Sequence, residues 1–143
     1  MRLFFDANVL FAAAYNQSGT PYGLISDLSH LGCEGFTSEY AWAETYKNLS
    51  NKAPSKLENL ENLKSHIRIE EFSPMLSDPI ELKEKDIPIF RAALFYSCSV
   101  LVTGDICDFG ELRGSSRRLI KIMTPKQCLE WLRQGRGACL HSL

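Results

Sequence analysis

The sequence lacks a long hydrophobic run, a paired cysteine motif and an excess of either charge. No stretch of about 18 apolar residues is present, so no membrane-spanning helix is expected. The five cysteines are odd in number and form no C-x-x-C pair, which indicates reduced thiols in a cytoplasmic protein rather than a zinc site or a disulfide framework. The net charge of −1 argues against binding nucleic acid by bulk charge but permits a local basic face.

The chain alternates segments typical of strands with segments typical of helices. Strands are predicted at residues 2–5, 33–37, 67–72, 100–103 and 119–123. Helices are predicted at residues 21–31, at residues 39–49, after Ser55, from Asp86, and at residues 125–132. This alternation predicts βαβ units, and therefore an α/β domain with a mostly parallel sheet over residues 1–133, followed by a flexible tail at residues 134–143.

Acidic residues stand where such a sheet would gather them. Asp6 directly follows the first apolar strand, and Asp105 follows the strand at residues 100–103, with Asp108 three residues later. Ligands of open α/β sheets bind at the carboxyl ends of strands. Two carboxylates about 5 Å apart repel by roughly 3 kcal/mol at an effective dielectric near 20. A hard divalent cation with oxygen ligands would offset this repulsion.

Two further acids belong to the same pattern, and each of the five also has an ordinary structural explanation. Glu44 lies in a predicted helix among apolar residues, and Asp86 opens another helix. Glu44 could simply face solvent, Asp86 could serve only as an N-cap, and the three remaining acids could be polar strand ends or turn residues. Coincidence at every one of these positions is improbable, so the joint pattern favours a metal site.

The same residues carry a family resemblance. They are Asp6-Ala7-Asn8-Val9-Leu10, Thr37-Ser38 with Glu44, Asp86 with Ala92-Ala93, and Leu101-Val102-Thr103-Gly104-Asp105 with Asp108-Phe109. In order and spacing the chain resembles the PIN domains, the fold of toxin-type endoribonucleases such as the VapC toxins. The resemblance implies a three-layer α/β/α fold and hydrolysis of single-stranded RNA that depends on Mg²⁺ or Mn²⁺.

The resemblance also implies roles for individual residues. The metal-binding, catalytic acids would be Asp6, Glu44, Asp86 and Asp105, with Asp108 as an auxiliary acid. Asn8 and Thr103 would brace the site. A bound metal would generate hydroxide and stabilise the charge on the phosphate. An antitoxin protein and a second copy of the chain are the partners that the resemblance makes possible.

Basic and aromatic residues could contact the substrate. Arg113, Arg117, Arg118 and Lys121 follow the Asp105 strand and could bind RNA phosphates, which position a strand without reading its sequence. Three further lysines (Lys47, Lys52 and Lys56) are candidates on the same reasoning, and three tyrosines (Tyr15, Tyr22 and Tyr40) could stack on bases. All of these could instead be solvated or core residues.

Other functions are weighed against a ribonuclease. A haloacid-dehalogenase-type phosphatase would carry a second Asp two residues after the first, where this chain has Asn8. A non-catalytic PIN-like module that binds RNA or protein, and a DNA nuclease, are the alternatives that remain open. The leucines at positions 57, 60 and 63 form one apolar stripe, which could face a homodimer partner or the core.

Overall fold

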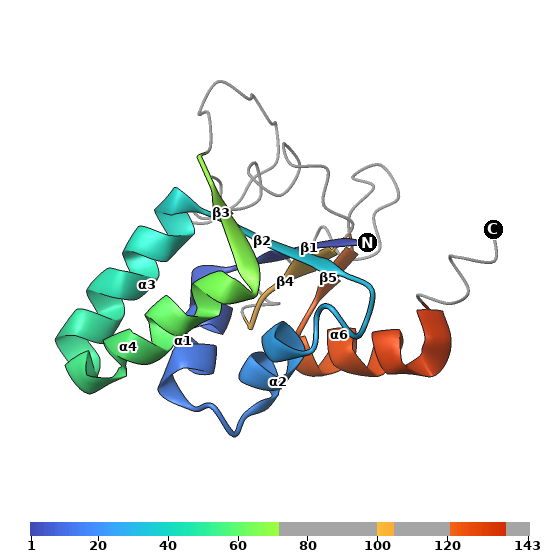
Figure 1. The fold of residues 1–143 in the computed structure, drawn as a ribbon, viewed down its shortest axis with the longest axis horizontal. Helices are drawn as coiled ribbons and strands as arrows, with labels where there is room; N and C mark the ends of the chain where they lie inside the picture. The colour runs from blue at the N-terminus through green and yellow to red at the C-terminus, as the bar shows by residue number, and fades with distance from the viewer. Residues whose placement is uncertain (72–99, 105–120, 137–143) are drawn as a thin grey trace.

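The computed structural model describes residues 1–71, 100–104 and 121–136, and these form a parallel sheet covered by helices (Figure 1). The strands are β1 (Arg2–Phe5), β2 (Glu34–Ser38), β3 (Ile67–Glu70), β4 (Val100–Val102) and β5 (Lys121–Met123). Their order across the sheet is β3-β2-β1-β4-β5, and every neighbouring pair is parallel. The predicted α/β class with a parallel sheet is therefore confirmed.

The central strand β1 defines the point at which the strand order reverses. The chain passes from β1 to β2 on one side, whereas β4 lies on the other side of β1. The register pairs Phe5 of β1 with Val102 of β4, so the residues that follow these two strands are neighbours. Ligands of open α/β sheets bind outside the carboxyl ends of strands at such a reversal point. The topology thus places a candidate site beyond β1 and β4.

The described helices form a continuous layer against the sheet. They are α1 (Ala7–Tyr15), α2 (Thr20–Ser26), α3 (Glu39–Lys52), α4 (Leu57–Asn62) and α6 (Pro125–Trp131), with 3-10 turns η1 (Pro54–Lys56) and η2 (Leu63–Ser65) and a π-helical turn η5 (Leu132–Arg136). Helix α1 contacts α2, α3 and α4, and α2 contacts α6 (Figure 1). None of the helices in the described part of the chain is long and apolar enough to cross a membrane.

The core lies between this helical layer and the sheet. Leu3 and Phe5 of β1 are fully buried. Gly35 of β2 lies so close to its neighbours that a Cβ there would come within 2.6 Å of Leu28 Cδ1 and 2.8 Å of Ile67 Cγ2. Only glycine lets the segment after α2 pack this closely onto the sheet. The leucine stripe of α4 and η2 also belongs to the core, because Leu60 and Leu63 are fully buried and Leu57 packs against the same cluster.

Two helix predictions differ from the structure, and one helix was not expected. Helix α1 was not predicted, because its apolar sequence has no periodic polar face to reveal it. The helix predicted at residues 21–31 ends at Ser26, and its N-cap is Gly19. Ser55 does not cap α4: Pro54 starts a 3-10 turn that contains Ser55, and the N-cap of α4 is Lys56.

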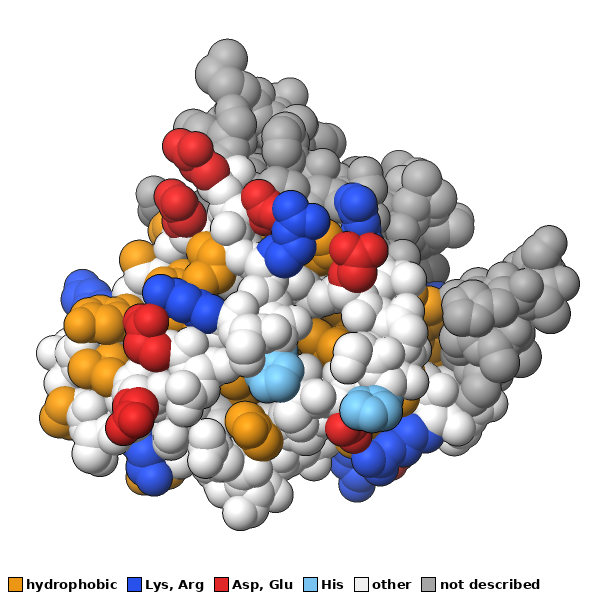
Figure 2. Space-filling model, in the orientation of Figure 1, with side chains coloured by type: hydrophobic (Ala, Val, Ile, Leu, Met, Phe, Trp, Pro, Cys, Tyr) orange, Lys and Arg blue, Asp and Glu red, His pale blue; other side chains and the backbone are white. Residues whose placement is uncertain are grey.

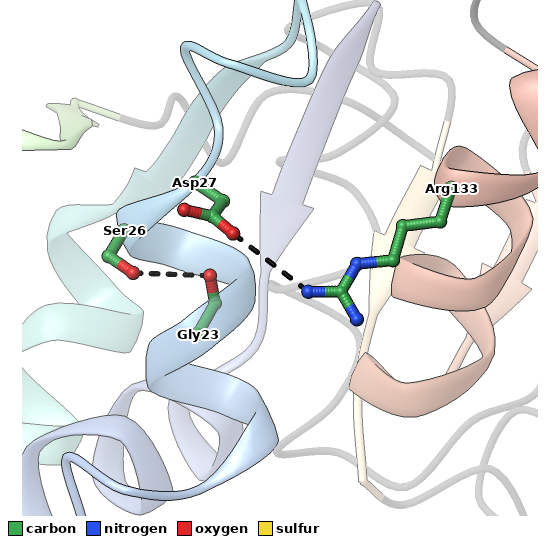
Figure 3. A network of polar contacts seen from close by, with 4 residues as sticks. All are labelled: Gly23, Ser26, Asp27 and Arg133. Carbon is green, nitrogen blue, oxygen red and sulfur yellow. Dashed lines mark hydrogen bonds and ion pairs between the residues drawn. The ribbon is translucent and has the colours of Figure 1, made fainter.

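The contact between α2 and α6 joins two distant parts of the chain. Arg133 Nη2 lies 4.0 Å from Asp27 Oδ2, and Ser26 Oγ donates to the carbonyl of Gly23 at 3.2 Å (Figure 3). Both charged side chains are about half exposed, so the pair contributes little stability. The two described cysteines, Cys33 and Cys128, are buried and free. The pKa of the Cys128 thiol is raised to about 12, mainly by burial and further by the nearby Cys33 thiol.

Candidate active site

Asp6 lies at the carboxyl end of the central strand and is almost completely buried, with 4% of its surface exposed. Its backbone N–H donates to the carbonyl of Val102 at 3.0 Å, which continues the pairing of β1 with β4. Its Oδ1 accepts from the N–H of Ala7 at 2.7 Å and so caps α1. The positive end of the helix dipole favours a negative charge here. The fold thus holds an anionic oxygen pair at the strand reversal point.

Thr103, the residue after β4, and Asn8 complete a hydrogen-bonded triangle with this carboxylate. The Thr103 hydroxyl donates to Asp6 Oδ2 at 2.7 Å, and Asn8 Nδ2 donates to the same oxygen at 3.1 Å. Asn8 Nδ2 also lies 3.2 Å from Thr103 Oγ1, which accepts because its proton is used on Asp6. Three donors therefore compensate the buried carboxylate and fix its orientation.

The two sides of the Asn8 amide contact different strands. Asn8 Oδ1 accepts from the N–H of Gly104 at 2.8 Å, while its nitrogen faces Asp6 and Thr103. This orientation is the one that satisfies every group, because a carboxylate can only accept and a backbone N–H can only donate. Asn8 thereby ties the start of α1 to the main chain that leads directly into Asp105.

The other strand ends show what an ordinary cap looks like in this fold. Ser38, the last residue of β2, accepts from the N–H of Ala41 at 3.1 Å, and Thr124, which follows β5, forms a capping box with Gln127. Both caps use neutral hydroxyls. An uncharged side chain would cap α1 equally well. A buried carboxylate held by donors from β4 and α1 therefore exceeds what helix capping requires.

Glu44 lies on α3, the helix that packs beside α1, and its side chain is half-buried. The next residue, Thr45, is fully buried, and its hydroxyl lies 2.8 Å from the carbonyl of Ala41 and 3.2 Å from that of Ala7. This contact joins α3 to the residue that follows Asp6, so Glu44 belongs to the helical turn nearest the start of α1. Thr45 was not among the predicted site residues, although a threonine four residues after Ala41 allows this type of backbone bond.

The remaining predicted site residues lie outside the described residues. They are Asp86, Asp105, Asp108, Arg113, Arg117 and Arg118. Within residues 1–71, 100–104 and 121–136, no group of three or more His, Cys, Asp or Glu is placed to hold a metal ion. The structure therefore brings together Asp6, Asn8 and Thr103, and positions Glu44 on the adjoining helix.

Three of the candidate phosphate-binding residues, Lys52, Lys56 and Lys121, lie in two separate regions of the described part. Lys121 starts β5, at the opposite end of the sheet from Asp6, and its Nζ lies 5.8 Å from the centre of the Trp131 ring. Lys52 and Lys56 instead lie over the aromatic rings of α1. On the face shown in Figure 2, acidic and basic side chains are interspersed, as the net charge of −1 leads one to expect.

The chemistry of the described donors fits a hard cation. Mg²⁺ and Mn²⁺ prefer carboxylate oxygen, and a magnesium site takes one or two carboxylates and completes its shell with water. Asp6 supplies an oriented carboxylate, and the hydroxyl and amide around it are the kind of partners that hold a metal-binding carboxylate in place. Neither of the described cysteines contributes a ligand to this edge, since Cys33 precedes β2 and Cys128 lies on α6.

Comparison with known proteins follows this geometry. Residues 2–107 match the family model described as the PIN domain. No curated protein sequence matches the chain.

Solved structures with the same fold include VapBC2 from Rickettsia felis bound to a DNA fragment from its promoter. Its TM-score is 0.66 at 19% identity, and the match covers 86% of this chain and 98% of that one. VapBC-1 from nontypeable Haemophilus influenzae gives a TM-score of 0.58 at 14% identity, covering 88% and 99% of the two chains. VapC20 from Mycobacterium tuberculosis, a toxin that cleaves the Sarcin-Ricin loop, gives 0.51 at 15% identity, covering 76% and 95%. These likenesses confirm the predicted three-layer α/β/α fold.

Proposed function

Because the chain belongs to the PIN domain family, we propose that it is a divalent-metal-dependent endoribonuclease that cleaves single-stranded RNA. The observation that carries this proposal is the buried Asp6 carboxylate at the strand reversal point, held by Thr103 and Asn8. A buried charge with this much support is costly to maintain for structure alone. A metal site that needs a carboxylate in a fixed orientation would explain why Thr103 and Asn8 hold Asp6 in this way.

The proposed metal ligands are Asp6, Glu44, Asp86 and Asp105. Bound Mg²⁺ or Mn²⁺ would lower the pKa of a water molecule and offset negative charge on the scissile phosphate. Asp6 would contribute its carboxylate from a fixed position, because its partners come from both β4 and α1. Glu44 would contribute from α3, whose distance from α1 is held by the Thr45 hydroxyl.

The residues around the acids would have supporting roles. Asn8 and Thr103 would maintain the orientation of Asp6, and Asn8 would also hold the main chain before Asp105 through Gly104. Asp108 would act as an auxiliary acid. The three arginines Arg113, Arg117 and Arg118 would bind phosphates of the RNA and offset the negative charge of the acids.

The proposed biological role is the toxin of a toxin–antitoxin pair. Two of the similar structures are described as VapBC assemblies, and this supports a protein antitoxin as the partner of this chain. A homodimer in the cytoplasm is also proposed. The leucine stripe of α4 gives the dimer no support, since Leu60 and Leu63 lie in the core.

The proposed function is tested by nuclease assays with an acid variant and a matched control. Wild-type protein is incubated with pools of single-stranded RNA and DNA, with Mg²⁺, with Mn²⁺, and with EDTA. Asp6→Asn removes the charge but keeps a side chain that can cap α1. Asp27→Asn is the control, because it removes a half-exposed acid that directly follows α2, pairs with Arg133 and lies away from the candidate site.

The expected result is RNA cleavage that requires metal, is lost in Asp6→Asn, and persists in Asp27→Asn. Cleavage of DNA in preference to RNA would move the assignment to a DNA nuclease. Folded wild-type protein that binds RNA but cleaves neither polymer would support a non-catalytic binding module. Equal cleavage by wild type and Asp6→Asn would refute the assignment of the site.

A further inference from the structure

A cluster of aromatic and basic side chains lies at the end of α1 that is farthest from Asp6. The rings of Phe11 and Tyr15 are stacked with centres 5.8 Å apart and an angle of 13° between their planes. Lys52 Nζ lies 5.7 Å from the centre of the Phe11 ring, and Lys56 Nζ lies 6.0 Å from that of Tyr15. Tyr15 is 52% exposed, so this group, here called the Tyr15 surface, is open to solvent.

The charge of the Tyr15 surface is positive although the chain as a whole is slightly negative. Residues 7–26 contain no charged side chain, and residues 45–57 contain three lysines and no acid. Lys64 gives a contrast within the same layer: it also lies over a ring, that of Trp42, but it is paired with Glu61 at 2.9 Å. Among the described residues, Lys52 and Lys56 have no such ion pair.

The Tyr15 surface and the candidate active site lie along the same two helices, α1 and α3. Helix α1 begins directly after Asp6, and its rise places Phe11 and Tyr15 about 6 Å and about 12 Å along the axis from Ala7. The same two helices connect both places, because Thr45 of α3 contacts Ala7 while Lys52 of α3 contacts Phe11. Asn59 Nδ2 donates to the carbonyl of Ala14 at 2.9 Å and so fixes the far end of α1.

We propose that the Tyr15 surface binds the part of a single-stranded RNA that extends beyond the acidic centre. This inference rests on the proposed ribonuclease function and adds a second contact to it. Aromatic rings that accept stacked bases, combined with cations that follow the backbone, form the usual platform for single-stranded nucleic acid. Lysine is depleted at protein–protein interfaces, so the lysines here favour RNA over a protein partner.

The test measures binding of a labelled oligouridine of about 16 nucleotides by fluorescence anisotropy in EDTA, which withholds the metal needed for cleavage. Tyr15→Ala is expected to raise Kd about 10-fold, whereas Tyr15→Phe keeps the ring and the wild-type affinity. The double variant Lys52→Ala, Lys56→Ala is expected to reduce the slope of log affinity against log salt by about 1.4. Lys64→Ala is the matched control and leaves the slope unchanged.

A cleavage experiment separates this inference from the proposed function. With metal present, Tyr15→Ala is expected to lower kcat/KM for an RNA substrate of about 16 nucleotides. For a substrate of about 4 nucleotides, kcat/KM is expected to stay unchanged. Wild type that binds RNA through Tyr15 without cleaving it would refute the ribonuclease but support the binding surface. If the Tyr15→Ala variant and the double-lysine variant both bound and cleaved RNA as well as the wild type does, the inference would be overturned. The surface would then be left to a protein partner.

Discussion

The hydrogen bond from Thr103 to Asp6 provides the most direct test of how the site is built. Thr103→Val replaces the hydroxyl by a methyl group of similar size, so its main effect is the loss of the hydrogen bonds of the hydroxyl. The substitution removes the donor that lies 2.7 Å from Asp6 Oδ2 and the acceptor that faces Asn8 Nδ2. Asp6 is only 4% exposed, so solvent replaces the lost partner poorly.

The expected loss of stability follows from the charge of the acceptor. A hydrogen bond to a charged group contributes about 1.5–3 kcal/mol, and a short O–H···O⁻ bond belongs to the strong class. We therefore expect Thr103→Val to lower the free energy of unfolding by about 2 kcal/mol. With a urea m-value of about 2 kcal/mol per molar, the midpoint would fall by about 1 M.

Urea denaturation at neutral pH, followed by circular dichroism, measures this change. Thr103→Ser is the matched control, because it keeps the hydroxyl and loses only a methyl group. A second measurement addresses function: removal of a group that orients a metal ligand typically lowers metal affinity or activity about 10- to 100-fold. Mn²⁺ titration and RNA cleavage by Thr103→Val should show a loss of this size, with Thr103→Ser close to wild type.

Two results would refute this reasoning. If Thr103→Val were as stable as wild type, the hydroxyl would not be needed to compensate the buried Asp6. If Thr103→Ser lost as much stability as Thr103→Val, the effect would come from packing of the methyl group and not from the hydrogen bond.

Three further predictions concern the stability of the fold. Gly35→Ala is expected to lower the free energy of unfolding by about 1–3 kcal/mol, because its methyl group would lie 2.6 Å from Leu28 Cδ1; an unchanged thermal midpoint would contradict this. Thr45→Val, which loses the contact with the Ala7 carbonyl, should destabilise by about 1 kcal/mol and reduce RNA cleavage, and Thr45→Ser should do neither. Burial raises the pKa of Cys128 from its ordinary 9.0 to about 12. The free energy of unfolding is therefore expected to fall as the pH rises from 9.0 toward 12. Cys128→Ala should flatten this part of the profile of stability against pH, measured by denaturation.

Local sequence patterns predicted most of the described sheet. Short apolar runs bounded by polar residues located all five strands of the described sheet to within a few residues. The helix predicted from Pro125 begins at that residue. Helix α1 escaped the same method because it contacts α2, α3 and α4 and needs no polar face. The helix predicted after Ser55 begins only at Leu57, because Pro54 starts a 3-10 turn that contains Ser55.

The sequence by itself determined that an acid stands at the end of an apolar strand, that α/β units alternate, and that the motifs resemble those of PIN domains. These are properties of neighbouring residues, so they can be seen in the order of the chain. Only the tertiary structure decided that Thr103 donates to a carboxylate 97 residues earlier and that Asn8 holds Gly104. These contacts depend on β4 pairing with β1, and strand order is set by the packing of the whole sheet rather than by any local pattern.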